Sequence, residues 1–214
     1  MRLYYHPFST NARRAVITAI ELAAPVELVL VDLVKREHRQ PAFLARNPAG
    51  RVPVLEDGDF VLPESHAIMV YLAERSAHQS LYPSDLQAQA QVNRWMFWCA
   101  AHFQPAISVL NWEHVVKRLA GLGAPDASEI MRGERLVQET AALLDSHLAS
   151  REWVAGPAMT LADISLATPL MTIATAKLPV TQFKHLHSWF ARIEARESWQ
   201  RTAVGTPSLS ASLC

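Results

Sequence analysis

The chain has 214 residues, enough for one large domain or two smaller ones, and half of them are hydrophobic, so it can bury a substantial core. Twenty Lys and Arg residues balance twenty acidic residues, which gives no electrostatic reason to expect binding to nucleic acid or to an anionic membrane. The two cysteines, Cys99 and Cys214, are too far apart in sequence for a CxxC pair, a zinc motif or a disulfide framework.

The amino-terminal sequence MRLYYHPFST has no apolar stretch of the kind found in signal peptides. No segment approaches the roughly 18 consecutive apolar residues of a membrane span. We therefore expect a cytoplasmic protein whose partner is a small molecule or another protein.

Residues 1–77 alternate between short β-type runs and helical segments, in the order β-α-β-α-β-β-α. The apolar run VLV at 29–31 predicts a central strand, covered on both faces and parallel to the first strand through a crossover helix. Asp57-Gly58, between two apolar runs, predicts a hairpin. These patterns indicate an α/β domain over residues 1–77.

Ser9, Thr10 and Asn11 stand where the first strand is followed by a helix. One interpretation is an N-cap cluster, because these side chains accept hydrogen bonds from the free N–H groups of a first helical turn. The other is an anion site, because a helix N-terminus is positive and a hydroxyl can donate a hydrogen bond. A thiolate would suit the second interpretation.

Two further segments of this domain allow both a structural and a functional interpretation. In NPAGRVPVL at 47–55, Pro53 either starts a strand with its missing N–H outward or follows a cis bond, which would leave the N–H and C=O of Val52 free for an extended peptide ligand. Glu64 and Ser65 precede an amphipathic helix, either as a dipole-favoured acid and an N-cap or as a site for a ligand's ammonium and carboxylate groups.

Residues 78–85 are predicted to be a linker, with Ser84 or Asp85 capping the next helix, and residues 86–214 to be an all-helical domain without strands. Pro105 should kink or break the first of its helices. The final GTPSLSASLC is typical of a loose tail. The positions expected to face the helical core are Val92, Trp95, Met96, Cys99, Phe103, Val137, Ala141, Leu144, Leu148, Leu186, Trp189, Phe190 and Ile193.

The ordered segments HPFSTNARRA, EHRQPAFLARNPAGRVPVL and PESHAIMVYLAE, followed by a helical region, resemble the cytosolic glutathione transferase family, in its serine-type (phi, theta or related bacterial) classes. MTLADISLA adds to the resemblance, because Thr160 and Asp163 form a capping box like the folding motif of that family's helical domain. The resemblance implies a thioredoxin-like glutathione-binding domain over 1–77, an all-α domain that supplies most of the electrophile pocket, and a homodimer.

The resemblance implies that Ser9 is the hydroxyl that activates the thiol, with Asn11 or Thr10 as alternatives or helpers. It also implies that His38 and Arg39 hold the glycine carboxylate and that the backbone of Val52 pairs with the cysteinyl part. Glu64 and Ser65 would hold the γ-glutamyl group. Arg51 departs from the pattern, since a Gln or Lys often stands there. The implied glutathione-binding residues are Thr10, Asn11, His38, Arg39, Arg51, Val52, Pro53, Glu64 and Ser65.

The resemblance implies a serine-type catalytic group, and the other classes of the family fit this point of the chain less well. Tyr4 and Tyr5 lie within the first strand, so neither takes the place of the tyrosine in the tyrosine-type classes. No cysteine stands there either, which argues against the thiol-disulfide and dehydroascorbate-reducing members.

The pKa of a free thiol shows how large a shift the protein must produce to ionise glutathione at neutral pH. A free thiol has a pKa of about 8.5, and lowering it by about two units, worth about 2.7 kcal/mol, makes the thiolate the main species at neutral pH. One charge-assisted hydrogen bond contributes about 1.5 to 3 kcal/mol, and a helix dipole adds a fraction. A hydroxyl at position 9 would therefore supply much of the shift.

The second substrate is less well defined. Trp95 and several aromatic neighbours are either plain helical core or the lining of an apolar cleft. The electrophile-binding candidates are Trp98, His102, Phe103 and Trp112.

The leading prediction is a metal-free enzyme that adds the thiol of glutathione to a small hydrophobic electrophile. The enzymatic alternatives are a glutathione-dependent isomerase, dehalogenase or peroxidase on the same fold; the isomerase likeness is poorer because its Ser-Ser-Cys stretch is missing after the first strand. A non-catalytic ligand-binding homologue is the other alternative. It would be expected to have a damaged glutathione site, whereas Ser9, Val52, Pro53, Glu64 and Ser65 are all present.

Overall fold

The computed structural model describes residues 1–77 and 80–204. Its internal contacts divide the described residues into two compact units, one made of residues 1–77, 80–82 and 194–204, and one made of residues 83–193. The sequence prediction assigned the whole of 86–214 to the helical domain, so the return of residues 194–204 to the first unit was not anticipated. The expected loose tail and Cys214 lie outside the described residues.

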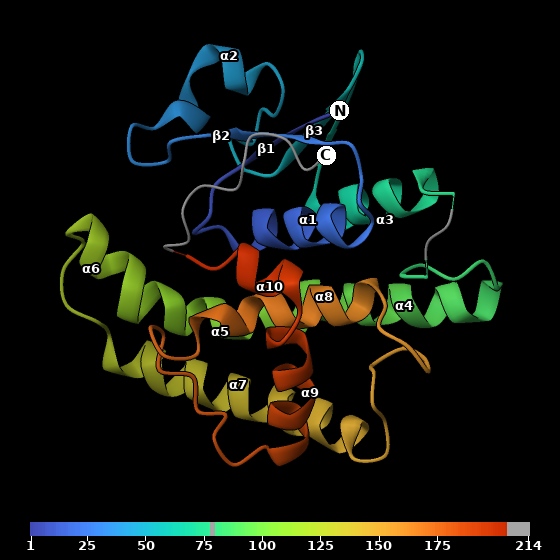
Figure 1. The fold of residues 1–214 in the computed structure, drawn as a ribbon. Helices are drawn as coiled ribbons and strands as arrows, with labels where there is room; N and C mark the ends of the chain where they lie inside the picture. Colours follow the sequence, from blue (N-terminus) through green and yellow to red (C-terminus); the bar gives the residue numbers. More distant parts are fainter. Residues whose placement is uncertain (78–79, 205–214) are drawn as a thin grey trace. The chain divides into compact units, whose positions relative to one another are not determined.

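The first unit is built on a four-stranded sheet with the strand order β2-β1-β3-β4 (Figure 1). Strand β1 (Arg2–Tyr5) is parallel to β2 (Glu27–Leu30) and antiparallel to β3 (Val54–Asp57), which is antiparallel to β4 (Phe60–Pro63). Its helices are α1 (Thr10–Glu21), the 3₁₀ turn η1 (Glu37–Arg39), α2 (Pro41–Leu44) and α3 (Ser65–Arg75). This order confirms the predicted β-α-β-α-β-β-α arrangement.

Helices cover both faces of this sheet. On one face α1 and α3 pack on Leu3, Leu28 and Leu55, and on the other Phe43 of α2 packs on Tyr4 and Val54. Alternate residues of β1 therefore belong to different cores, as the two-residue period of a strand requires. The sheet thus has a buried layer on each side.

Val29 and Leu30 of the VLV run lie in a strand parallel to the first, as predicted, but Val31 follows its end, and the prediction that this strand is central was wrong. Strand β2 is an edge strand, and Leu30 is 57 % exposed. An apolar run does not distinguish a central strand from an edge strand whose faces are partly covered, because both need similar side chains. The hairpin prediction is confirmed, with Gly58 at φ +60° in the turn that follows Asp57.

The second unit is helical, and residues 80–204 contain no strand. The predicted core positions in its helices are all buried. Its elements are α4 (Leu86–Trp98), the π turn η2 (Cys99–Phe103), α5 (Gln104–Asn111), the π turn η3 (Trp112–Val116), α6 (Lys117–Ala120), α7 (Ala127–Leu148), α8 (Leu161–Ala167), the 3₁₀ turn η4 (Thr168–Thr172) and α9 (Lys184–Glu194), whose last residue belongs to the first unit.

Pro105 interrupts the α-helical hydrogen bonding without breaking the helix. The α-helix ends at Trp98, a π turn follows, and the N–H of Gln104 donates to the carbonyl of Cys99 before α5 continues. A proline lacks the N–H of a regular helical bond and its ring crowds the carbonyl four residues earlier. The wider turn directly before Pro105 accommodates both defects, so the predicted break is wrong and the predicted irregularity is correct.

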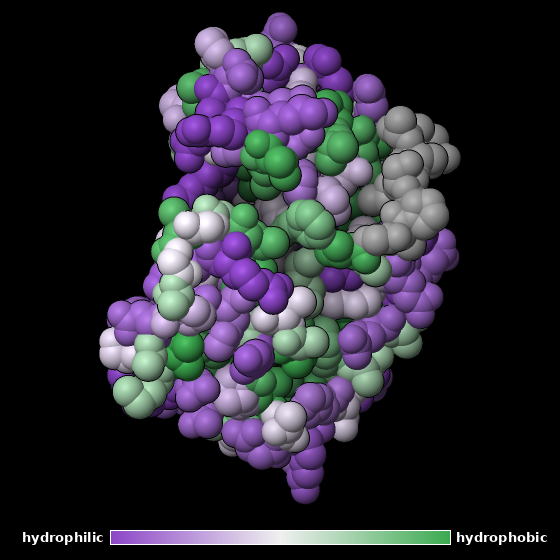
Figure 2. Space-filling view, turned by 90° about the vertical axis from the view of Figure 1, so that its left-hand side faces the viewer, coloured by the Kyte–Doolittle hydropathy of each residue, from purple (hydrophilic) through white to green (hydrophobic). Residues whose placement is uncertain are grey.

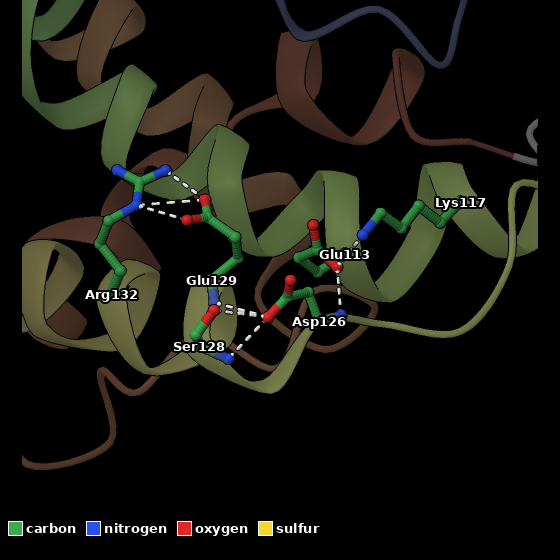
Figure 3. Close-up of polar contacts among 6 residues, drawn as sticks. All are labelled: Glu113, Lys117, Asp126, Ser128, Glu129 and Arg132. Atoms are coloured by element: carbon green, nitrogen blue, oxygen red, sulfur yellow. Dashed lines mark hydrogen bonds and ion pairs between the residues drawn. The ribbon is translucent and has the colours of Figure 1, made fainter.

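Two helices of the second unit, α4 and α7, have an aspartate as N-cap. Asp85, one of the two predicted caps, accepts from the N–H of Ala88 at 2.9 Å. At the N-terminus of α7, Asp126 accepts from the N–H groups of Ser128 and Glu129 (Figure 3). The buried Glu113 accepts from Nζ of Lys117 at 2.6 Å and from the N–H of Asp126 at 2.7 Å. Glu113 thereby connects η3 and the start of α6 to the N-terminus of α7.

The predicted capping box at α8 is confirmed. Asp163 is fully buried and accepts from the N–H of Thr160 at 2.8 Å, from that of Val154 at 2.9 Å and from the indole Nε1–H of Trp189 at 2.9 Å. Burial raises the pKa of Asp163, and these donors oppose the rise. One carboxylate therefore joins three segments of the helical unit.

The last helix, α10 (Glu197–Arg201), packs on α1 within the first unit. Among the described residues, no helix combines the length and the apolar character that a membrane span needs. On the face drawn in Figure 2, hydrophilic side chains predominate and hydrophobic ones form small groups between them.

Candidate active site

The strand register brings four predicted site segments to one edge of the sheet. Tyr5 pairs with Leu30 in parallel, so the segments that follow β1 and β2 leave at the same edge. Val54 pairs with both Tyr4 and Pro63, so the segment before β3 and the segment after β4 meet there too. Residues 6–10, 31–39, 51–53 and 64–65 therefore gather at one end of the first unit.

Ser9 is the N-cap of α1. Its Oγ accepts from the N–H of Ala12 at 3.2 Å, and its own N–H donates to the carbonyl of His6 at 3.0 Å. A hydroxyl that accepts in this way still has its proton to donate. The capping and anion-binding interpretations of Ser9 are thus compatible, and one side chain can serve both.

The N-terminus of α1 keeps its positive character. Its first turn contains no acidic residue, and Thr10 and Asn11, both partly exposed, occupy its first positions. The free N–H groups of such a turn favour an anion placed at the end of the helix. The local chemistry at Ser9 therefore suits a sulfur anion.

The segment between β1 and α1 also presents an aromatic side chain that sequence reasoning missed. Phe8 is 66 % exposed and lies against the imidazole of His6, with ring centroids 5.3 Å apart. Nδ1 of the buried His6 accepts from the N–H of Phe8 at 3.2 Å, and burial lowers the pKa of this histidine. An exposed apolar ring next to Ser9 offers a surface for an apolar substrate; its signal in the sequence was a large hydrophobic residue between Pro7 and Ser9.

His38 and Arg39 lie on η1, at the same sheet edge. Nδ1 of His38 is buried and has no hydrogen-bond partner among the described residues, and burial, reinforced by Arg39 and Arg36, lowers the pKa of His38. The exposed Arg39 donates to the carbonyl of Ala49 at 3.4 Å. A buried ring nitrogen without a partner beside cationic side chains suits an anionic ligand that also carries a hydrogen-bond donor.

Asn47 organises the turn before β3 and was not singled out from the sequence. Its Nδ2 donates to the carbonyl of Arg51 at 2.8 Å, and its Oδ1 accepts from the N–H of Ala49 at 3.1 Å. The side chain of Arg51 is exposed, and the Val52–Pro53 bond that follows is cis, which is one of the two arrangements expected. Val52 lies two positions before Val54, the first residue of β3, and outside the register with β1.

At the start of α3 the structure corrects the capping interpretation of Ser65. Glu64 occupies the N-cap position and makes no side-chain capping bond, while Ser65 is the first helical residue and is buried. Glu64 has φ +72° and ψ 111°, a backbone conformation that residues other than glycine rarely adopt. Such strain is often found at ligand-binding positions, so the open first turn of α3 is a second candidate anion site.

A buried polar network supports the sheet below these loops. Glu56 accepts from the hydroxyl of Tyr4 at 2.9 Å and from Nε of Arg46 at 2.6 Å, and it lies 3.0 Å from Nη2 of Arg2. Burial opposes ionisation of Glu56, but the bonds from Tyr4 and Arg46 lower its pKa overall. The network fixes the end of α2 to β1 and β3.

The four electrophile candidates all belong to the second unit. The ring of Trp98 is partly buried and stacks on that of Phe103 at 5.7 Å, and His102 is exposed. Trp112 is 46 % exposed, whereas Phe103 is fully buried. Phe103 is thus buried as its predicted core position requires, and its place among the electrophile-binding candidates stays a prediction. Among residues 1–77 and 80–204, no cluster of His, Cys, Asp or Glu is arranged to hold a metal ion.

Comparison with known proteins gives the family. The family models "Glutathione S-transferase, N-terminal domain" and "Glutathione S-transferase, C-terminal domain" match residues 1–74 and 95–197. Glutathione S-transferase 3 of Zea mays is 36 % identical, covering 97 % of this chain and 95 % of its own length.

Two further comparisons extend this result. Glutathione S-transferase theta-2B of Homo sapiens is 33 % identical, covering 91 % of this chain and 81 % of its own. The solved structure of glutathione S-transferase-I bound with the ligand lactoylglutathione superimposes with a TM-score of 0.84 at 25 % identity, over 94 % of this chain and 97 % of that one. The chain belongs to the glutathione S-transferase family, with relatives in its phi and theta classes.

Proposed function

We propose that this chain binds glutathione at the sheet edge formed by residues 6–10, 31–39, 51–53 and 64–65, and transfers its thiol to an electrophilic carbon. The observation that carries the proposal is Ser9, which caps α1 through its oxygen and keeps its proton to donate. Support for glutathione as the substrate comes from the family and from the relative whose structure contains lactoylglutathione.

The proposed anchoring follows the charges along this edge. The γ-glutamyl end, with its ammonium and carboxylate, binds at Glu64 and Ser65, and the backbone of Val52 pairs with the cysteinyl part. The glycine carboxylate binds between His38 and Arg39, with Arg51 beside them. Each anchor supplies a group that complements the corresponding part of the tripeptide.

The reaction places the sulfur at the N-terminus of α1. The thiol loses its proton to solvent, and the resulting anion is stabilised by the hydroxyl of Ser9 and by the helix end. The sulfur lone pair forms the C–S bond, and the leaving group departs with its electrons or the product carbon takes up a proton. Phe8 offers an apolar surface next to the sulfur. The proposed electrophile candidates of the helical unit are Trp98, His102, Phe103 and Trp112.

The test is Ser9→Ala, compared with Ser9→Thr, which keeps both the hydroxyl and the cap. We expect Ser9→Ala to lower kcat by about 10- to 100-fold, the value of one charge-assisted hydrogen bond, while the Kd for glutathione stays within about threefold. Ultraviolet titration should show the pKa of the bound thiol rising by about one to two units. Ser9→Thr should retain most of the activity.

Two results would contradict this proposal in different ways. If Ser9→Ala keeps full activity with a standard electrophile, Ser9 is only a cap and Asn11 or Thr10 becomes the candidate. If isothermal titration of the unaltered protein detects no glutathione binding at millimolar concentration, the chain is a non-catalytic relative.

A further inference from the structure

Arg13 is a buried cation on the helix that begins at Ser9. It lies one turn into α1, and only 5 % of its surface is exposed. Its Nε donates to Oγ1 of Thr202 at 3.1 Å, and its Nη2 donates to the carbonyl of Trp199 at 2.9 Å. The guanidinium also lies over the indole of Trp199, 3.8 Å from the ring centroid. Every one of these partners belongs to α10 or directly follows it.

All of these contacts are electrically neutral. They involve a hydroxyl, a carbonyl and an aromatic ring, and Arg13 makes no ion pair within the described part of the chain. Burial lowers the pKa of Arg13 to about 10, an effect that Glu194 opposes. The side chain therefore stays protonated at neutral pH, and its charge is not cancelled by direct contact with an acid.

In the described part of the chain, the charged groups on the neighbouring elements do not form an ion pair with Arg13. At the far end of α1, Glu21 accepts from Nε and Nη2 of Arg196 at 2.7 and 2.6 Å, and from the hydroxyl of Ser198, so this acid is already paired. Toward α3, Arg14 lies 2.7 Å from Nε2 of His66. Glu194 remains as the acid whose field reaches Arg13.

These contacts fix α10 along the length of α1. Arg13 lies near one end of α1 and Glu21 at the other, and both bind the segment 196–202. The two attachments hold the guanidinium at a set position relative to the beginning of α1. Arg13 is four positions after Ser9 in the chain, a rise of about 6 Å along the helix axis.

We infer that Arg13, held in place by α10, stabilises the glutathione thiolate through its buried positive charge and is a second source of thiol activation besides the Ser9 hydroxyl. The inference rests on the proposed function. Arg13 does not touch the substrate; it acts through space, and its field adds to that of the helix N-terminus. In general, two unit charges about 10 Å apart at an effective dielectric constant of about 20 interact strongly enough to shift a pKa by about one unit.

The alternative is that Arg13 only joins two helices, and variants can separate the two roles. Arg13→Gln removes the charge, whereas Arg13→Lys keeps it and loses the two-point hydrogen bonding. Thr202→Val removes one bond to Arg13 and leaves its charge. Arg201→Gln is the matched control, because it removes a more exposed cation from the same α10, where Arg201 pairs with Glu197 at 3.3 Å.

The measurement is an ultraviolet titration of glutathione bound to the full-length protein, together with the pH profile of kcat/KM and the melting temperature. Arg13→Gln should raise the pKa of the bound thiol by about one unit and move the pH profile by the same amount. Arg13→Lys, Thr202→Val and Arg201→Gln should leave that pKa within about 0.3 unit of the unaltered protein. The first two of these should lower the melting temperature.

The inference is overturned if Arg13→Gln titrates like the unaltered protein, or if Thr202→Val or Arg13→Lys raises the thiol pKa as much as Arg13→Gln does. If Arg13→Gln does not fold, Arg13→Lys and Thr202→Val decide the question. Both keep the cation, so a rise of about one unit in the pKa of the bound thiol in either variant excludes a role for the charge. A protein that binds glutathione without lowering its thiol pKa contradicts the proposed function instead, and the variants need not be made.

Discussion

Gly50 shows how one backbone position constrains the proposed glycine-carboxylate site. Its φ is +58°, and an added Cβ would lie 2.8 Å from Nη1 of Arg39 and 2.9 Å from the carbonyl oxygen of His38. The turn before β3 and the 3₁₀ turn η1 are therefore packed so closely that only a hydrogen atom fits between them. Gly58, in the β3–β4 hairpin, has φ +60° and no neighbour within 4 Å of such an atom.

These two glycines allow a matched test of the site. Both Gly50→Ala and Gly58→Ala carry the cost of a positive φ, about 1 kcal/mol or somewhat more. Only Gly50→Ala also displaces His38 or Arg39, so we expect it to raise the KM for glutathione by about tenfold with little change in kcat. Equal KM values for the two variants would mean that η1 does not bind the tripeptide.

At the residue scale, chemistry that is local in sequence could be predicted and chemistry that depends on distant partners could not. Ser9 follows a strand and precedes a helix, so its cap role follows from its immediate neighbours. The partners of Arg13 lie 186 and 189 residues away, and Glu56 lies 52 residues from Tyr4. No periodicity or motif in the sequence indicates which distant side chain will bury a charge.

At the scale of single elements, α8 depends on one carboxylate for its beginning. Asp163 satisfies the N–H of Thr160, the N–H of Val154 and the indole of Trp189, and all three donors lose their partner if it is removed. We expect Asp163→Ala to lower the free energy of unfolding by about 2 to 4 kcal/mol, measured by urea unfolding. The buried donors, rather than the helix end alone, cause most of the loss.

Asp85→Ala is the comparison for that prediction. Asp85 caps α4 from an exposed position through one bond to Ala88. Its removal should cost only about 1 kcal/mol, the usual value of an N-cap. Similar losses for the two variants would show that the bonds of Asp163 to Val154 and Trp189 contribute nothing beyond capping.

Element boundaries and types followed from the sequence wherever one principle acted alone. The apolar period predicted the buried face of α7, and the Asp57-Gly58 dipeptide predicted its hairpin. Two principles compete at Pro105, where the ring opposes a regular helix while apolar side chains on both sides favour one. The π turn resolves this conflict, and its position depends on packing that a linear pattern does not describe.

For the molecule as a whole, histidines that are buried or partly buried make stability depend on pH. Burial, with the nearby charge of Arg14, lowers the pKa of His66 to about 3, whereas an unfolded histidine has a pKa of about 6.5. The unfolded chain therefore binds a proton that the folded chain does not. The resulting stability is complete above pH 6.5 and is lost progressively as the pH falls toward 3.

We expect the free energy of unfolding to fall between pH 6 and 4 by up to about 1.4 kcal/mol per pH unit for His66 alone. Burial also lowers the pKa of His6, His38 and His147, so they add to the same slope. His66→Gln, which keeps an acceptor for Arg14, should flatten the slope in urea unfolding series. His185→Gln, at a partly exposed position, is the control, and an unchanged slope in His66→Gln would refute the assignment.

The packing of α10 on α1 has a consequence for how the protein is made. A ribosome releases the amino-terminal unit long before it adds residues 196–202, so the sheet and its helices emerge without the partners of Arg13 and Glu21. Until residues 196–202 have been made, the nascent chain carries the Arg13 guanidinium without its partners Trp199 and Thr202. Completion of the substrate-binding half is thus coupled to translation of residues 196–202, and a product that stops before them lacks this closing segment.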